Sequence, residues 1–122
     1  MILLNDFYTM PHFEPTEGSV KAKIIINKNH RILAGHFPGL PIVPGVCMMQ
    51  IIREIMEMMS GKDLLLKSAD NMKFLSVINP DNQTEVDVSI SYTALQDQFV
   101  VNATLFATTT TFFKLKATMT IN

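Results

Sequence analysis

The chain reads Gly35-His36-Phe37-Pro38-Gly39-Leu40-Pro41-Ile42-Val43-Pro44-Gly45-Val46 and then continues to Ser60 without another glycine or proline. Three prolines and three glycines in the quoted stretch predict a rigid, turn-rich loop rather than a regular helix or strand. The loop carries one histidine and leads to a predicted helix start at about Pro44-Gly45, where proline is well placed and backbone N–H groups lack helical partners. A titratable base beside fixed hydrogen-bond donors suits chemistry on a carbonyl compound.

The segment after this loop, Val46–Ser60, has the length and periodicity of a helix, and Gly61 suits the position that follows a helix end. Its polar residues fall on one stripe of the helix surface: Gln50, Arg53, Glu54 and Glu57. The other positions through Met59 are apolar. The helix is therefore predicted to be buried on most of its circumference, as a central helix wrapped by other elements would be.

Alternation of apolar and polar residues predicts strands in most of the remaining chain. One strand precedes the loop and the others follow the helix: Val20–Asn27, Leu64–Leu66, Asn71–Ile78, Thr84–Tyr92, Phe99–Ala107 and Phe113–Ile121. The N-terminal segment Ile2–Tyr8 is predicted to pack on the domain edge, with Pro11 and Pro15 bracketing a loop. One long helix followed by antiparallel strands predicts the α+β class, in a single domain over residues 1–122.

Composition and charge argue against several classes of protein. The formal net charge of −1 argues against a nucleic-acid partner and against electrostatic binding to a membrane. The N-terminus does not read as a signal peptide, and no apolar run is long enough for a membrane-spanning helix. The single cysteine, Cys47, is predicted to be a buried structural residue, and its count fits a cytoplasmic setting. Of the histidines, His12 and His30 are predicted to lie on the surface, and no metal-ligand spacing is present.

The stretch His36-Phe37-Pro38-Gly39-x-Pro41-Ile42-x-Pro44-Gly45-Val46 resembles the signature of the 3-hydroxyacyl-[acyl-carrier-protein] dehydratases of bacterial fatty acid synthesis, with nine of eleven positions carrying the family residue. Weaker similarity covers Asn27 to Gly35, and Met72-Lys73-Phe74-Leu75 followed by Pro80. The resemblance implies the hot-dog fold, in which a curved antiparallel sheet wraps a central helix. It also implies dimers, often stacked into larger oligomers, and no cofactor beyond the phosphopantetheine arm of the acyl carrier protein.

The same resemblance assigns roles to residues. It implies that His36 is the catalytic base and that the backbone N–H of Gly45 receives the thioester carbonyl oxygen. The neighbouring motif residues Phe37, Pro44 and Val46 are predicted to bind substrate. These expectations place the chemistry between the loop and the start of the helix.

The chain departs from the family at the catalytic acid. The family has a carboxylate five residues after the glycine, contributed by the partner subunit relative to the histidine, and here that position is Gln50. Glutamine can hold a hydroxyl or water but has no proton to give at neutral pH. Where the family often has glutamine one turn later, this chain has Glu54, so the two look like a swapped pair at i and i+4. Glu54 is accordingly a candidate acid, with pairing to a neighbouring cation as the alternative.

Three functions follow as hypotheses. The leading one is a dehydratase acting on acyl thioesters in fatty acid or specialised polyene lipid synthesis, with His36, Gln50 and Glu54 as catalytic residues. The second is an acyl thioesterase of the hot-dog superfamily, in which Gln50 orients the attacking water. The third is a non-catalytic or half-site subunit, in which a homologous chain of a heterodimer supplies the missing acid, or a module that binds the carrier protein.

Overall fold

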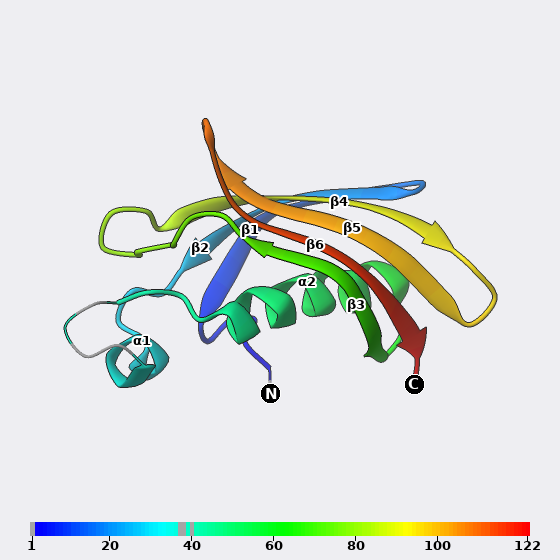
Figure 1. The fold of residues 1–122 in the computed structure, drawn as a ribbon, viewed down its shortest axis with the longest axis horizontal. Helices are drawn as coiled ribbons and strands as arrows, with labels where there is room; N and C mark the ends of the chain where they lie inside the picture. Colours follow the sequence, from blue (N-terminus) through cyan, green and yellow to red (C-terminus); the bar gives the residue numbers. More distant parts are fainter. Residues whose placement is uncertain (1, 37–38, 40) are drawn as a thin grey trace.

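The computed structural model of the chain describes residues 2–36, 39 and 41–122. Its elements follow one another in the order β1 (Tyr8–Thr16), β2 (Ser19–Ile26), α1 (Arg31–His36), α2 (Gly45–Ser60), β3 (Leu64–Phe74), β4 (Glu85–Ala94), β5 (Gln98–Ala107) and β6 (Thr110–Ile121) (Figure 1). The strands form one six-stranded sheet in the order β1-β2-β4-β5-β6-β3, and every neighbouring pair is antiparallel. β1 and β3 therefore lie at the two edges.

The sheet curves around α2, which lies along its inner face (Figure 1). Ile52, Ile55 and Met56 of this helix are fully buried against the inward-facing residues of the sheet, among them Ile24, Val101 and Leu105. Of α2, only Val46 and Met58 are exposed. The predicted α+β class and the predicted central, mostly buried helix are both confirmed.

The ends of α2 are set by the residues that the sequence predicted. The helix begins at Gly45, directly after Pro44, whose backbone is extended at φ −64° and ψ 147°. At the other end, Gly61 adopts a left-handed conformation with φ 69° and donates its N–H to the carbonyl of Glu57 at 2.8 Å. Glycine reaches this conformation without the penalty that a side chain would bring, so it ends the helix cleanly.

Three predicted segments are corrected. Residues 8–16 form strand β1 rather than a loop, because an edge strand tolerates proline and the register shifts between Thr9 and His12, around Pro11. The two predicted segments after the helix form the single strand β3, which keeps its pairing with β6 through two irregularities. Residues 31–36, which include the first two residues of the predicted loop, form the short helix α1. A helix can form there because all three prolines of the loop come after His36.

The described residues contain no helix that combines the length and the apolar character needed to cross a membrane. They also contain no cluster of three or more metal-ligating side chains of the His, Cys, Asp or Glu type.

Candidate active site

The short helix α1 carries His36 at its last position, and the structure shows how α1 is held. His30, directly before α1, accepts the N–H of Ile32 at Nδ1 (3.0 Å) and hydrogen-bonds through Nε2 to Asp6 (3.1 Å). Its ring also meets the edge of Phe7, with 5.3 Å between ring centroids. The prediction that His30 lies on the surface is therefore wrong, because its ring fixes α1 to the N-terminal segment.

His36 and Phe37 are two of the predicted site residues. The side chain of His36 and the whole of Phe37 lie outside the described residues. The backbone of His36 is described and ends α1, one loop away from the start of α2.

The start of α2 offers backbone hydrogen-bond donors. The N–H groups of Cys47 and Met48 both donate to the carbonyl of Pro44, at 3.0 and 3.2 Å. Within the described part of the chain, the N–H groups of Gly45 and Val46 meet no acceptor, as expected for the first residues of a helix. Because the helix dipole adds partial positive charge at this end, these donors suit an oxygen on which negative charge develops.

The ring of Phe74, at the end of β3, lies directly against Gly45. A Cβ atom at position 45 would come within 2.6 Å of the ring, so any side chain there would have to displace it. The ring also packs on Phe113, with 5.1 Å between centroids, and remains 57% exposed. Sequence reasoning assigned no role to Phe74, although it lies in a segment that resembles the family.

A groove of about 320 Å³ runs beside this contact. Its walls are mostly apolar and come from two segments, Ile42–Gly45 with Met48 on one side and Phe74–Val77 on the other. Of the residues predicted to bind substrate, Pro44 lines this groove, whereas Val46 faces a separate slot. That slot, of about 140 Å³, lies between α2 and the strands and also includes Gln50 and Arg53.

Gln50 and Glu54 are in direct contact, as the i and i+4 spacing predicted. The Nε2 group of Gln50 donates to Oε2 of Glu54 at 2.7 Å. Gln50 is half-buried and lies one and a half turns after Gly45 on the same helix. The two residues therefore form one polar unit beside the start of α2.

Glu54 also holds the N-terminal segment. Its carboxylate accepts the backbone N–H groups of Leu3 and Leu4, both at 2.8 Å, and the hydroxyl of Tyr8 at 2.9 Å. With Gln50, four donors converge on this one carboxylate, which is 7% exposed. Burial, together with the negative charge of Glu54, raises the pKa of Tyr8 far above its usual range. Glu54 thus lies in the interior, although the helix periodicity placed it on the polar stripe.

Cys47 is buried close to the helix start, as predicted. Burial raises the pKa of its thiol, which keeps the sulfur protonated and unreactive at neutral pH.

Comparison with known proteins shows which family the chain belongs to. Residues 12–111 match the model of the ApeI-like family, described as ApeI dehydratase. Among curated proteins, the chain is 26% identical over 85 residues to the 3-hydroxyacyl-[acyl-carrier-protein] dehydratase FabZ of Latilactobacillus sakei, covering 64% of this chain and 60% of that protein. The chain thus spans about three fifths of the length of the curated relatives that it matches.

Solved structures show the fold. The dehydratase heterocomplex ApeI:P from Xenorhabdus doucetiae has a chain that superposes with a TM-score of 0.74 at 17% identity, over 92% of this chain and 96% of that one. A mutant thioesterase from Staphylococcus aureus superposes with a TM-score of 0.71 at 12% identity, over 98% of both chains. These likenesses confirm the predicted hot-dog fold.

Proposed function

Because the chain belongs to the family of ApeI-like dehydratases, we propose that it removes water from 3-hydroxyacyl thioesters held on acyl carrier protein. The observation that carries this proposal is the open helix start at Gly45, which follows the loop after His36. We place the reaction in the cytoplasm, in fatty acid or specialised polyene lipid synthesis, on a single hot-dog domain. The reaction takes a proton from C2 and the hydroxyl from C3, which together make water, so it draws on no cofactor beyond the phosphopantetheine arm of the carrier.

In the proposed reaction, the imidazole of His36 takes the proton from C2 of the acyl chain. The N–H of Gly45 and the start of α2 stabilise the negative charge that develops on the thioester oxygen. The C2–H electron pair forms the new double bond to C3 while the C3–O bond breaks, and the departing hydroxyl gains a proton to leave as water. Phe37, Pro44 and Val46 are proposed to contact the acyl chain or its arm.

Gln50 and Glu54 bear on the source of that last proton. Gln50 is proposed to position the 3-hydroxyl, and Glu54 orients Gln50 through the 2.7 Å hydrogen bond. Glu54 as the acid stays a prediction. Its carboxylate oxygens already accept four hydrogen bonds, from Leu3, Leu4, Tyr8 and Gln50, which supports a positioning role over a proton-donating one.

Gln50 stands where the family has a carboxylate, and this observation favours two other candidate functions. In the first, Gln50 orients a water molecule that attacks the thioester, and the products are a free acid and a thiol. In the second, a homologous chain supplies the acid across a heterodimer, and this chain supplies His36. The relative named ApeI:P is itself a heterocomplex, which fits the second candidate.

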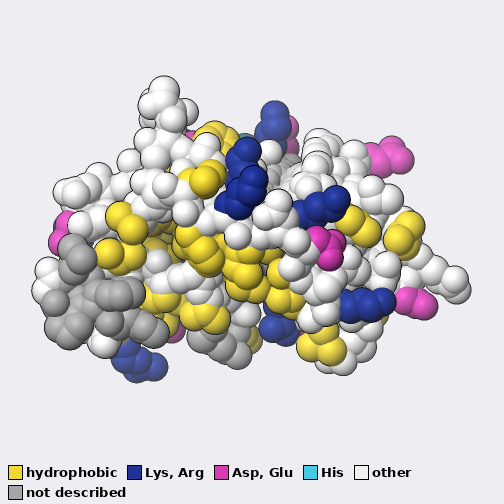
Figure 2. Space-filling view, viewed as in Figure 1, with side chains coloured by type: hydrophobic (Ala, Val, Ile, Leu, Met, Phe, Trp, Pro, Cys, Tyr) yellow, Lys and Arg dark blue, Asp and Glu magenta, His cyan; other side chains and the backbone are white. Residues whose placement is uncertain are grey.

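We propose that β3 forms the interface with the second subunit, in a homodimer or larger oligomer or in such a heterodimer. All residues of β3 after Leu64 are exposed, and its outer edge has no partner strand among the described residues. The exposed apolar residues on or beside it are Leu65, Leu66, Met72, Phe74, Leu75 and Val77. Figure 2 shows apolar side chains in a band across this side of the molecule. An edge strand with this character is typically covered by pairing with another chain.

The test is turnover of a 3-hydroxyacyl carrier protein by the purified chain, with mass detection of every product. Enoyl product that disappears in His36→Ala supports the dehydratase, and free acid would identify a thioesterase. Glu54→Gln and Gln50→Glu locate the acid. If only Gln50→Glu, or an added homologous chain, gives enoyl product, the chain is a half-site subunit. No turnover under any of these conditions would refute the dehydratase proposal.

A further inference from the structure

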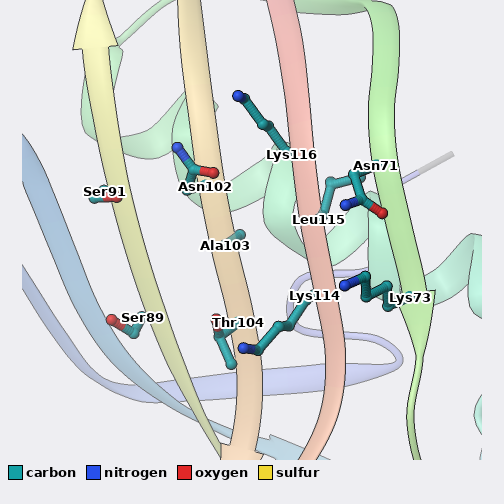
Figure 3. Close-up of a pocket in the computed structure, with 10 residues that line it drawn as sticks. All are labelled: Asn71, Lys73, Ser89, Ser91, Asn102, Ala103, Thr104, Lys114, Leu115 and Lys116. Carbon is teal, nitrogen blue, oxygen red and sulfur yellow. The ribbon is translucent and has the colours of Figure 1, made fainter.

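The outer face of the sheet, turned away from α2, carries three lysines close together (Figure 3). Lys73 belongs to β3, and Lys114 and Lys116 belong to β6, where they alternate with the inward-facing, buried Leu115 and Ala117. The lysines line a shallow basin of about 360 Å³, together with small polar side chains from the same face: Asn71, Ser89, Ser91, Asn102 and Thr104. We call these three lysines and their polar neighbours the lysine basin.

The register of the strands concentrates positive charge in this basin. Lys73 lies directly opposite Lys114, a like-charge pairing that destabilises a sheet. Lys116 has asparagine on both sides, Asn71 on β3 and Asn102 on β5. Figure 3 shows the side chain of Lys114 extending toward β5 and that of Lys73 extending toward β6.

No carboxylate neutralises these lysines within the described part of the chain. The ion pairs found there involve other residues, such as Lys23 with Asp87 and Arg53 with Glu57. Asp70, the acidic residue of β3, instead accepts a hydrogen bond from Ser68 at 3.4 Å. A chain with a net charge of −1 therefore keeps an uncompensated positive cluster on one sheet face, at a cost to sheet stability.

The lysine basin lies close to the candidate active site, across the end of β3. Lys73 and Phe74 are neighbours on this strand, so their side chains point to opposite faces. Phe74 lies against Gly45, whereas Lys73 lies in the basin. Beyond Phe74, residues 75–77 line the 320 Å³ groove beside the helix start. A flexible arm tethered at the basin would need to pass only around the end of β3 to enter this groove.

We propose that the lysine basin is the docking surface for the acidic protein that carries the acyl thioester. This inference rests on the proposed function, because it assigns the carrier to this face and its arm to the groove. Complementary charge would speed the encounter and orient the carrier. The basin lacks the exposed apolar residues with which a membrane-bound surface inserts, and its backbone N–H groups are engaged in sheet pairing rather than arranged to cradle a free phosphate.

The experiment compares one acyl group on two supports. A 3-hydroxyacyl group is attached either to a holo-acyl carrier protein or to pantetheine alone, and turnover is measured for the unaltered chain and for Lys114→Glu/Lys116→Glu. We expect KM for the carrier-bound substrate to rise about tenfold or more, because charge pairs across an interface control association. KM and kcat for the pantetheine substrate should not change, which also shows that the variant is folded.

Two variants serve as comparisons. Lys114→Gln/Lys116→Gln removes the charge without reversing it and should raise the same KM by a smaller factor. Lys62→Glu changes the net charge by the same amount as this double glutamine variant, but just beyond the far end of α2, about 24 Å from Gly45 for a helix of 16 residues, and should leave turnover of both substrates unaffected.

Binding is measured separately, by fluorescence anisotropy of labelled holo-acyl carrier protein at increasing salt, so that docking is tested even if no chemistry occurs. We expect the charge reversal to weaken this binding and to flatten its salt dependence. An unchanged affinity and an unchanged KM in the charge-reversal variant would overturn the proposal. It would also be overturned if the variant lost binding only to vesicles containing phosphatidylglycerol, which would assign the basin to a membrane. Failure of the proposed function alone would appear as no turnover on either support, with charge-dependent carrier binding retained.

Discussion

At the scale of single residues, Glu54 is the group whose role the structure changes most. A buried carboxylate is costly unless it is hydrogen-bonded, and this one accepts four donors from α2, β1 and the N-terminal segment. In Glu54→Gln, an NH₂ group would replace one carboxylate oxygen, and an NH₂ group cannot accept hydrogen bonds from these donors. We expect it to lower the free energy of unfolding by about 1–3 kcal/mol, measured by urea denaturation.

The exposed Glu85→Gln is the matched control and should leave stability almost unchanged. Stability and turnover must both be measured, because the structural role of Glu54 predicts a loss of stability, whereas a role as the acid predicts a loss of turnover. An unaltered unfolding free energy with abolished dehydration would contradict the structural role and favour Glu54 as the acid.

Tyr8 makes stability depend on alkaline pH. Burial first, and then Glu54, raise the pKa of its hydroxyl above the ordinary value of 10.0. The folded chain therefore keeps a proton that the unfolded chain releases above pH 10, so this contribution to stability is complete below pH 10 and is lost as the pH rises. We expect the unfolding free energy to fall by about 1.4 kcal/mol per pH unit there from Tyr8 alone.

The check is a series of urea unfolding curves between pH 8 and pH 11.5. Tyr8→Phe should be less stable at neutral pH, because it loses the 2.9 Å hydrogen bond to Glu54, yet it should show a flatter decline in alkali. Tyr92→Phe removes the other tyrosine as the control. Parallel declines for Tyr8→Phe and the unaltered chain would contradict this account.

At the scale of elements, the contact between the start of α2 and the end of β3 shapes the groove. Gly45→Ala would place a methyl group within 2.6 Å of the Phe74 ring, which is exposed enough to swing away. We expect little change in stability but a lower kcat/KM, by about tenfold or more, because a displaced ring alters the approach to the Gly45 N–H. Adding Phe74→Leu should restore part of the activity. Equal activity in Gly45→Ala and the unaltered chain would show that the ring does not shape the site.

The pairing of β3 with β6 tests whether the lysine basin is kept at the expense of stability. Lys114→Glu puts a carboxylate opposite Lys73. Opposite charges in a cross-strand pair stabilise a sheet, so we expect the unfolding free energy to rise by about 0.2–1 kcal/mol. Thermal and urea unfolding of this variant beside Lys114→Gln measure the effect. A less stable Lys114→Glu would mean that the two lysines do not repel each other.

Sequence reasoning succeeded where a local signal sets the structure. Pro44, Gly45 and Gly61 mark the ends of α2, and alternation marks the strands that were predicted. It failed where distant residues decide the outcome. Helix periodicity placed Glu54 on the polar stripe, because nothing local shows that Leu3 and Leu4 supply its donors from fifty positions away. The contact of Phe74 with Gly45 likewise depends on how β3 meets α2.

At the scale of the whole molecule, the two sheet edges differ in a way that predicts assembly. The edge strand β1 carries Pro11 and Pro15, which remove donors and discourage pairing with another chain. The other edge, β3, presents Leu65 and Leu66 to solvent with exposed fractions of 46% and 40%. A second subunit is therefore expected on β3.

Leu66→Asp should shift the chain toward the monomer, because a charge at the edge must be desolvated when strands pair. Sedimentation equilibrium over a range of protein concentrations measures the association. Leu95→Asp changes another exposed leucine, in the turn between β4 and β5 away from this edge, and should leave association unchanged. The family resemblance implies that the residue matching Gln50 reaches the histidine from the partner subunit, so we expect the Leu66→Asp monomer also to lose the proposed dehydration. If Leu66→Asp stays associated while Leu95→Asp dissociates, the subunits meet elsewhere and the proposed β3 interface is wrong.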